Sequence, residues 1–355
     1  MSLIKKYIKY LPATMNMPIV SLGEGNTPLI KLDNLLRSQN ITSIDWYVKT
    51  EGSNPTGSFK DRGMTLAVSK AKESGSTAIL CASTGNTSAS ASAFAARAGI
   101  QAFVIIPQGK IALGKLAQAM MHGAIVLQIK DNFDTGMQLV KELSKTLPIT
   151  LVNSVNPYRL QGQKTVAFEI VDFLNKAPDY HYVPVGNAAN ISASWMGYEE
   201  YYKDNKMDNK PKMIGYQANG AAPFLRGKRI DNPHTIATAI CIGHPHSWDL
   251  AQAAVSNSQG WFGEVSDQEI LEAQYLLSST EGIFCEPASA ASIAGVLKDF
   301  KLGFIKPNSI VVSTLTGHGL KDPNIAIDQC KNKNAIIEIP QDYESVKLII
   351  QEKLK

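Results

Sequence analysis

Short apolar runs alternate with longer helix-like segments along most of the chain, and this alternation constrains the fold more than any other feature. Runs such as 77–83 and 102–107 are continuously apolar, which is typical of strands buried on both faces of a parallel sheet. Segments 58–75 and 86–99 have helical character. The pattern predicts β-α-β units and an α/β fold with open sheets. Further strand-like runs are 44–50, 124–129, 149–154, 180–186, 212–218 and 309–317.

Size and charge narrow the class of protein. A chain of 355 residues is too long for one ordinary compact core and fits two lobes. Its net charge is +4 and its lysines are scattered, so we expect no nucleic-acid partner. The N-terminus lacks a leader's apolar core, and no stretch approaches the roughly 18 apolar residues of a membrane span, so we expect a cytoplasmic protein. Neither disulfides nor a metal site is expected from four widely spaced cysteines, Cys81, Cys241, Cys285 and Cys330.

Polar loops rich in Gly, Ser, Thr and Asn follow several strand-like runs. They occupy residues 53–58, 83–88, 186–190 and 316–319. Ordinary turn chemistry accounts for any one of them. In open α/β sheets, however, ligands bind at the carboxyl ends of strands, and four such loops at equivalent positions favour one polar, phosphate-bearing ligand.

Lys60 lies in one of these regions, at the predicted start of a helix. Ser58 and Asp61 stand three residues apart, as in a capping box, which places Lys60 in the first helical turn. A cation there opposes the helix dipole. That position suits either an ordinary surface lysine or one whose pKa is lowered for Schiff-base chemistry.

The segment SNPTGSFKDRG at 53–63 resembles the cofactor-lysine motif of the fold-type II pyridoxal-phosphate enzymes, a family that includes threonine synthases, threonine dehydratases, cysteine synthases and the tryptophan synthase β-subunit. Four other segments resemble the threonine synthases: SLGEGNTPLI at 21–30, NPYRLQGQKT at 156–165, PVGNAANI at 184–191 and LTGHGLKDP at 315–323. Gln161 and Ala189 stand where that family usually has glutamate and glycine. The matches run in order along most of the chain, which resembles the short bacterial form.

The resemblance implies a cofactor, pyridoxal 5'-phosphate, and residues to hold it. Lys60 is implied as its covalent anchor, Asn86 as the partner of its ring hydroxyl and Thr316 as the residue facing its pyridine nitrogen. A cradle for its phosphate is implied at Gly186, Asn187, Ala188, Ala189 and Asn190. Backbone N–H groups at a helix start suit an anion. If Ala189 needs a left-handed backbone, it costs roughly 1 kcal/mol.

The implied activity is that of a threonine synthase, a lyase of threonine biosynthesis that converts O-phospho-L-homoserine and water to L-threonine and phosphate. The resemblance implies two open-sheet lobes like those of the tryptophan synthase β-subunit and a homodimer. We expect residues 49–150 in a smaller domain, and 1–48 with 151–355 in a larger one. Arg159 suits bidentate contact with the substrate phosphate. The implied substrate cradle is Ser83, Thr84, Asn153, Ser154 and Arg159.

Several alternatives remain open from the sequence. Arg159 is also consistent with a structural arginine paired with a nearby acid. His318 fits either a cofactor contact or a turn, and Glu286 fits either a role near the ring or a helix cap. The alternatives are a serine or threonine dehydratase or a related β-eliminating enzyme of the same fold, and a non-catalytic cofactor or amino-acid sensor on this scaffold. Retention of Lys60, Asn86 and Thr316 together argues against the sensor.

Overall fold

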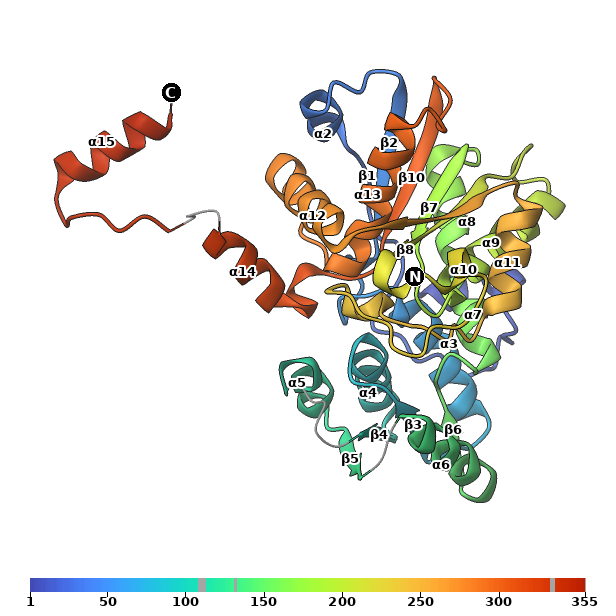
Figure 1. Cartoon of the computed structure of the whole chain (residues 1–355). Helices are drawn as coiled ribbons and strands as arrows, with labels where there is room; N and C mark the ends of the chain where they lie inside the picture. Colours follow the sequence, from blue (N-terminus) through green and yellow to red (C-terminus); the bar gives the residue numbers. More distant parts are fainter. Residues whose placement is uncertain (108–112, 131–132, 333–335, 355) are drawn as a thin grey trace. The chain divides into compact units, whose positions relative to one another are not determined.

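The computed structural model describes residues 1–107, 113–130, 133–332 and 336–354. Residues 1–321 form one compact unit and residues 322–355 a second, and each is described by itself. The first unit contains two sheets (Figure 1). The alternating pattern therefore correctly predicts an α/β fold with open, mainly parallel sheets. The domain boundaries at 49 and 150 stay a prediction.

The larger sheet has six strands in the order β1-β2-β10-β7-β8-β9. Only the edge strand β1 is antiparallel to its neighbour. Strands β2 and β10 are far apart in sequence but pair in parallel from Ile44 with Ser309 to Thr50 with Leu315. The strands are β1 Leu29–Lys31, β2 Ile44–Thr50, β7 Tyr180–Pro184, β8 Lys212–Ala218, β9 Trp261–Val265 and β10 Ser309–Leu315.

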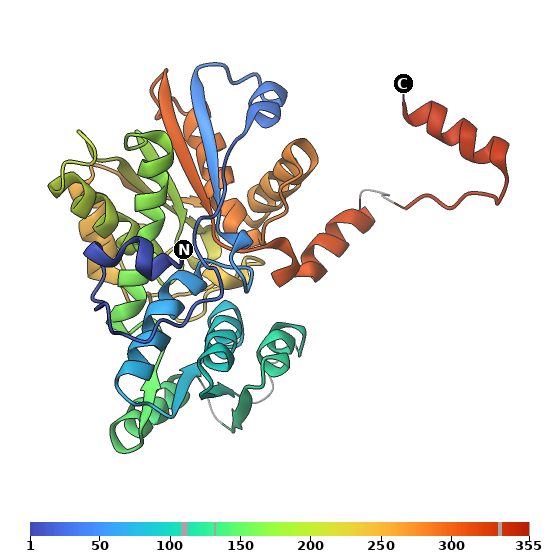
Figure 2. The same cartoon turned by 180° about the vertical axis from the view of Figure 1, so that it is seen from behind.

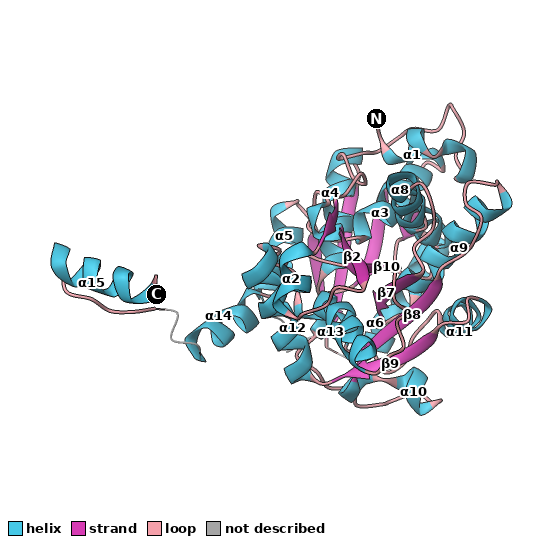
Figure 3. Ribbon diagram, turned by 90° about the horizontal axis from the view of Figure 1, so that it is seen from above, coloured by secondary structure: helices cyan, strands magenta, loops and turns pink. Residues whose placement is uncertain are grey.

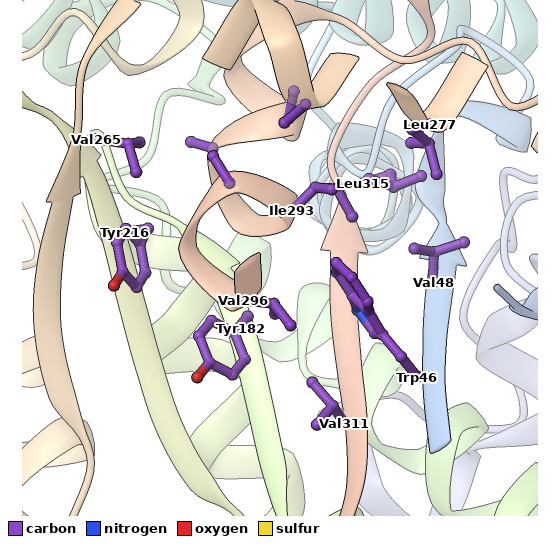
Figure 4. Packing of buried hydrophobic residues seen from close by; sticks show 14 of the residues in the cluster. Trp46, Val48, Tyr182, Tyr216, Val265, Leu277, Ile293, Val296, Val311 and Leu315 are labelled. Atoms are coloured by element: carbon purple, nitrogen blue, oxygen red, sulfur yellow. The ribbon is translucent and has the colours of Figure 1, made fainter. Parts of the chain in front are cut away.

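Helices cover both faces of this sheet (Figure 3). On one face lie α2 (Asp33–Ser38), α12 (Asp267–Glu281) and α13 (Pro287–Lys301). Their contact with the sheet is a buried cluster that includes Trp46, Tyr182 and Ile293 (Figure 4). On the other face lie α8 (Thr165–Leu174), α9 (Ala189–Lys203) and α11 (Trp248–Asn257). Burial on both faces explains why the strands read as continuous apolar runs.

The N-terminal segment packs against this second helical layer. It contains α1 (Leu3–Lys6) and is drawn in dark blue in Figure 2. The ring of Tyr7 lies 5.2 Å from that of Phe168 on α8, measured between centroids. The hydroxyl of Tyr7 donates to Asp172 at 3.0 Å. The segment is thus tied to the larger sheet rather than free.

The smaller sheet has four parallel strands in the order β5-β4-β3-β6. The strands are β3 Ala78–Ala82, β4 Gln101–Pro107, β5 Ile125–Ile129 and β6 Ile149–Leu151. The helices that alternate with them or precede them are α3 Lys60–Glu73, α4 Asn86–Ala98, α5 Leu113–Met121 and α6 Phe133–Thr146. A short helix, α7 (Pro157–Gln163), follows β6 and precedes α8.

The remaining elements are short. In the first unit they are α10 (Pro223–Arg226) and the 3₁₀ helices η1 (Ile8–Tyr10), η2 (Glu51–Ser53), η3 (Asn219–Ala221), η4 (Thr238–Ile240) and η5 (Gly319–Lys321). The second unit contains α14 (Pro323–Asn332) and α15 (Tyr343–Lys353), and Asp342 caps α15 by accepting from the backbone N–H of Ser345 at 2.9 Å. Within the described residues, no helix has the length and apolar character needed to cross a bilayer.

Candidate active site

Three of the four polar loops meet near the carboxyl end of β10. A short antiparallel bridge joins Ser58 to Gly317, and the backbone N–H of Phe59 donates to Thr316 O at 3.0 Å. The backbone N–H of Glu286 donates to Gly317 O at 3.0 Å, and the Asn86 side chain donates to Glu286. Loops 53–58, 83–88 and 316–319 therefore lie together, and the ligand that we expect all four loops to share stays a prediction.

Lys60 is the first residue of α3, so its predicted place in the first helical turn is confirmed. Loss of hydration, and then the nearby positive charge of Arg159, lower the pKa of the Lys60 amine to about 7, against the opposing charge of Glu286. The amine lies 4.2 Å from the ring centroid of Phe59. An amine with a pKa near 7 is partly unprotonated at neutral pH, so it can form a Schiff base and transfer protons. A fully hydrated surface lysine stays protonated and cannot do so as readily.

The predicted capping box at this helix is wrong. The N-cap residue is Phe59, which makes no side-chain capping bond, and Ser58 Oγ is buried with no hydrogen-bond partner among the described residues. The Asp61 carboxylate instead accepts from Thr56 N at 2.7 Å and from the Thr56 and Ser90 hydroxyls at 2.6 Å each. Asp61 thus joins the loop before Lys60 to helix α4.

Glu286 connects Asn86 with Thr316. Its Oε2 accepts from Asn86 Nδ2 at 3.0 Å, and its Oε1 accepts from Thr316 Oγ1 at 3.2 Å. It stands at the N-cap of α13 but makes no side-chain capping bond. It therefore does not cap the helix by a side-chain hydrogen bond, and its two bonds place it beside Asn86 and Thr316. Burial raises the pKa of the Glu286 carboxyl, against its bonds with Asn86 and Thr316 and the charges of Lys321 and Lys60.

The loop at 186–190 leads from β7 into α9. The left-handed residue is Ala188, with φ +66°, and Ala189 is the first residue of the helix. The predicted strain therefore falls on Ala188 and not on Ala189. Gly186 is required, because a Cβ there would lie 2.8 Å from Ile240 Cα. Asn190 Nδ2 is buried without a hydrogen-bond partner among the described residues, at a helix start whose first N–H groups lack partners within the helix.

The side chain of Asn187 links this loop to the neighbouring sheet. Its Nδ2 donates to Ser154 Oγ at 2.7 Å, and its Oδ1 accepts from His246 N at 2.6 Å. Asn153, next to Ser154, exchanges hydrogen bonds of 2.9 Å with both backbone groups of Ala82 at the end of β3. The predicted phosphate loop and two members of the predicted substrate cradle are therefore joined.

Arg159 is a buried guanidinium on α7 with 1% of its surface exposed. Its Nη1 donates to Val152 O at 2.8 Å, while its Nε is buried with no partner in the described part of the chain. No carboxylate of that part forms an ion pair with it, so the interpretation as an acid-paired arginine is wrong. Loss of hydration lowers the pKa of Arg159 to about 10, against the influence of Cys81 and Asp61.

Arg62 shows what a structural arginine looks like in the same chain. It is equally buried, but its Nε lies 2.6 Å from Glu51 Oε2 and its Nη2 lies 2.7 Å from Glu169 Oε2. A buried cation without such partners is costly unless an anion completes the site. Arg159 thus differs from Arg62 in having no carboxylate partner within the described residues. Ser83 and Thr84, its predicted companions, are half-buried in the loop that precedes α4.

His318 and His244 each contact another residue of the chain. His318 Nδ1 accepts from Leu320 N at 3.1 Å, which is a turn contact. His244 lies 3.0 Å from Asp231, and no group of three metal-ligating side chains occurs within the described residues. Lys321 has no role predicted from sequence, although it lies in the segment LTGHGLKDP at 315–323. Its Nζ donates to Gln118 Oε1 at 2.5 Å, and its charge influences Glu286.

Comparison with known proteins agrees with this geometry. Residues 20–317 match the family described as pyridoxal-phosphate dependent enzyme. The threonine synthase of Halalkalibacterium halodurans is 55% identical over 343 residues, covering 97% of this chain and 95% of the relative. That of Methanocaldococcus jannaschii is 51% identical over 356 residues, covering 98% and 87%.

Solved structures share the fold at low sequence identity. The processed form of threonine deaminase isoform 2 from Solanum lycopersicum superposes with a TM-score of 0.72 at 20% identity, covering 87% of this chain and 83% of that one. Maize serine racemase gives a TM-score of 0.73 at 20% identity, covering 88% and 93%. These likenesses concern the architecture alone.

Proposed function

The chain belongs to the family of pyridoxal-phosphate dependent enzymes, and from this premise we propose which of its residues carry out the reaction. Its function is that of a threonine synthase, a pyridoxal-phosphate dependent lyase that converts O-phospho-L-homoserine and water to L-threonine and phosphate.

The residues present fit the cofactor. Ser58 Oγ and Asn190 Nδ2 are buried polar atoms without partners in the described chain, as expected of groups that await a polar ligand. Lys60, whose amine has a pKa of about 7, is suited to form a Schiff base with the cofactor. Asn86 and Thr316 would contact the ring hydroxyl and ring nitrogen. The loop Gly186, Asn187, Ala188, Ala189 and Asn190 would hold the phosphate.

The bound cofactor supplies the electron sink for the chemistry at the α- and β-carbons of the substrate. Lys60 would move protons: its free amine would act as general base at the α- and β-carbons, and as general acid it would deliver one proton to the γ-carbon, which becomes the methyl group, and return one to the α-carbon. A pKa of about 7 suits both roles near neutral pH. Phosphate leaves from the γ-carbon, and water adds at the β-carbon.

Arg159 binds the substrate phosphate, and its burial without an acidic partner is the observation that carries the proposal. A guanidinium presents donors in a fork that matches phosphate oxygens. Ser83, Thr84, Asn153 and Ser154 complete the cradle. Because Asn187 bonds Ser154, the substrate cradle adjoins the cofactor loop. Serine and threonine would leave these donors unpaired, so they are poor substrates.

The test is phosphate release from O-phosphohomoserine, measured beside ammonia release from serine and threonine. We expect release of phosphate with threonine as the product, and little reaction with the unphosphorylated amino acids. Faster turnover of serine or threonine than of O-phosphohomoserine would favour a dehydratase instead. We further propose a cytoplasmic homodimer, which sedimentation and fractionation test directly.

A further inference from the structure

Glu286 is hydrogen-bonded to both Asn86 and Thr316, and these two partners differ in whether they can donate or accept. On one side an amide N–H can only donate to Glu286 Oε2, at 3.0 Å. On the other side, the Thr316 hydroxyl lies 3.2 Å from Glu286 Oε1 and can either donate or accept. The Glu286 side chain is buried, so bulk water does not compete for these bonds.

The single hydrogen of the Thr316 hydroxyl makes the direction of this bond consequential. An ionised carboxylate can only accept hydrogen bonds, so the Thr316 hydroxyl donates its hydrogen to Glu286. The lone pairs of Thr316 Oγ1 are then left to accept a hydrogen bond from another group. A protonated carboxyl donates to Thr316 Oγ1 and frees the Thr316 hydrogen. Ser289 Oγ, 2.9 Å from Thr316 Oγ1, is a hydroxyl and adapts to either direction. Of these three residues, only Glu286 changes charge.

We propose that Glu286 sets the direction in which the Thr316 hydroxyl donates, and thereby decides whether the cofactor atom facing Thr316 meets a donor or an acceptor. This inference rests on the proposed function, in which that atom is the pyridine nitrogen. Ionised Glu286 favours a protonated nitrogen, and protonated Glu286 favours an unprotonated one. Hydrogen bonds at ring nitrogens tune a cofactor's electronic properties, so Glu286 acts as a positioning residue through Thr316.

Nearby charges and burial have opposite effects on the pKa of Glu286. Lys60 on α3 and Lys321 in η5 both favour the ionised carboxylate, as do the bonds from Asn86 and Thr316, whereas burial favours the protonated form. The neighbouring Cys285 thiol stays neutral, because burial raises its pKa and Glu286 raises it further. Neither form of Glu286 is locked by an ion pair within the described residues. Its protonation therefore responds to pH and to events at Lys60.

The experiment measures the chemical shift of the isotopically labelled pyridine nitrogen in the holoenzyme, as a function of pH. The parent is compared with Glu286→Gln, which keeps the shape but cannot ionise. We expect the two to differ in shift at one or more pH values at which both stay folded. Thr316→Ser retains the hydroxyl and should follow the parent. Thr316→Val removes it, and adding Glu286→Gln to Thr316→Val should then produce no further shift.

Two results would overturn the inference. One is an identical nitrogen shift in the parent and Glu286→Gln at every pH. The other is an equally large effect of Glu286→Gln with and without the Thr316 hydroxyl, because the influence would then not pass through Thr316. Failure of the parent to bind the cofactor or to release phosphate would instead contradict the proposed function, and these measurements are made on the same preparation.

Discussion

Gly63 of α3 and Gly162 of α7 pack backbone against backbone. A Cβ on Gly162 would lie 2.0 Å from Arg62 O, and one on Gly63 would lie 2.7 Å from Arg159 O. The helix that begins with Lys60 and the helix that bears Arg159 therefore approach as closely as their main chains allow. This contact fixes the amine that is proposed to move protons relative to the guanidinium that is proposed to bind the substrate phosphate.

Gly162→Ala is expected to destabilise the protein and to reduce activity. The added methyl cannot fit against a backbone carbonyl, so α7 must shift, at a cost of about 1–3 kcal/mol or more. Urea unfolding measures the loss. Gly303→Ala is the control: no atom lies within 4 Å of its added Cβ, and only its φ of +74° is unfavourable, which costs about 1–2 kcal/mol. A fully active, undestabilised Gly162→Ala enzyme would contradict the role of this contact.

Lys60→Ala is expected to abolish turnover and covalent attachment of the cofactor. Borohydride reduction of the loaded enzyme followed by peptide mass spectrometry should place the adduct on Lys60 in the parent and find none in the variant. Lys70→Ala, in the same helix but ion-paired with Glu73 at 2.7 Å, should behave like the parent. Normal turnover of Lys60→Ala with an adduct on another lysine would remove Lys60 from the mechanism.

Ala188→Gly and Ala189→Gly are expected to change stability in opposite directions. Ala188 has φ +66°, a conformation that costs an L-residue about 1–2 kcal/mol and glycine very little. Glycine loses about 0.4–1 kcal/mol through its greater freedom in the unfolded chain, so we expect Ala188→Gly to stabilise by up to about 1 kcal/mol. Ala189 is helical, and Ala189→Gly should destabilise by about 1 kcal/mol. Thermal unfolding of the two variants tests the signs.

Local features of the site were predictable from sequence, and long-range ones were not. Lys60 lies at a helix start as predicted from nearby residues, although the capping box on which that prediction rested does not form. The apolar runs predict strands because sheet burial leaves that pattern. The adjacency of β2 and β10 joins residues more than two hundred positions apart, which no local pattern encodes. Nearby residues left Glu286 open between a helix cap and a role near the ring, because its partners Asn86 and Thr316 come from distant loops.

Acidification is expected to lower the free energy of unfolding, because it protonates Glu169. Burial alone would raise the pKa of this carboxyl, but the charges and hydrogen bonds of Arg62 and Lys49 outweigh it and hold the pKa well below its usual 4.5. A carboxyl whose pKa is depressed by folding stabilises the folded state above its unfolded pKa. That contribution is lost as the pH falls through and below about 4.5. We expect the free energy of unfolding to decline over this range.

Glu169→Gln is the matched variant for this pH dependence. Breaking a buried ion pair costs about 3–5 kcal/mol, so the variant should be less stable at neutral pH. It should also lose less stability on acidification than the parent, because the substituted amide cannot take up a proton in this range. Urea titrations at several pH values give both quantities. A variant with the same acid slope as the parent would assign the acid sensitivity to other carboxyls.

Arg159→Leu separates a threonine synthase site from that of a dehydratase. A hydrogen bond to a charged group contributes about 1.5–3 kcal/mol, and an unpaired buried charge costs more. At tenfold per 1.4 kcal/mol, kcat/KM for O-phosphohomoserine should fall about a hundredfold or more. Cofactor binding should not change, because Arg159 lies outside the cofactor loops. Arg97→Leu, on the exposed face of α4, is the control and should keep parental activity.

The response of unphosphorylated substrates decides how Arg159→Leu is interpreted. Serine and threonine have no phosphate for the guanidinium to bind, so their slight turnover should fall much less than that of O-phosphohomoserine, although loss of the Arg159 charge also acts on the pKa of Lys60. A parallel fall for every substrate would mean that Arg159 supports the structure of the site through Val152 rather than binding phosphate. Arg159→Lys distinguishes the two further, because it keeps the charge but loses the bidentate fork. If the fork binds phosphate, Arg159→Lys should recover part of the lost kcat/KM for O-phosphohomoserine and leave the other substrates unchanged.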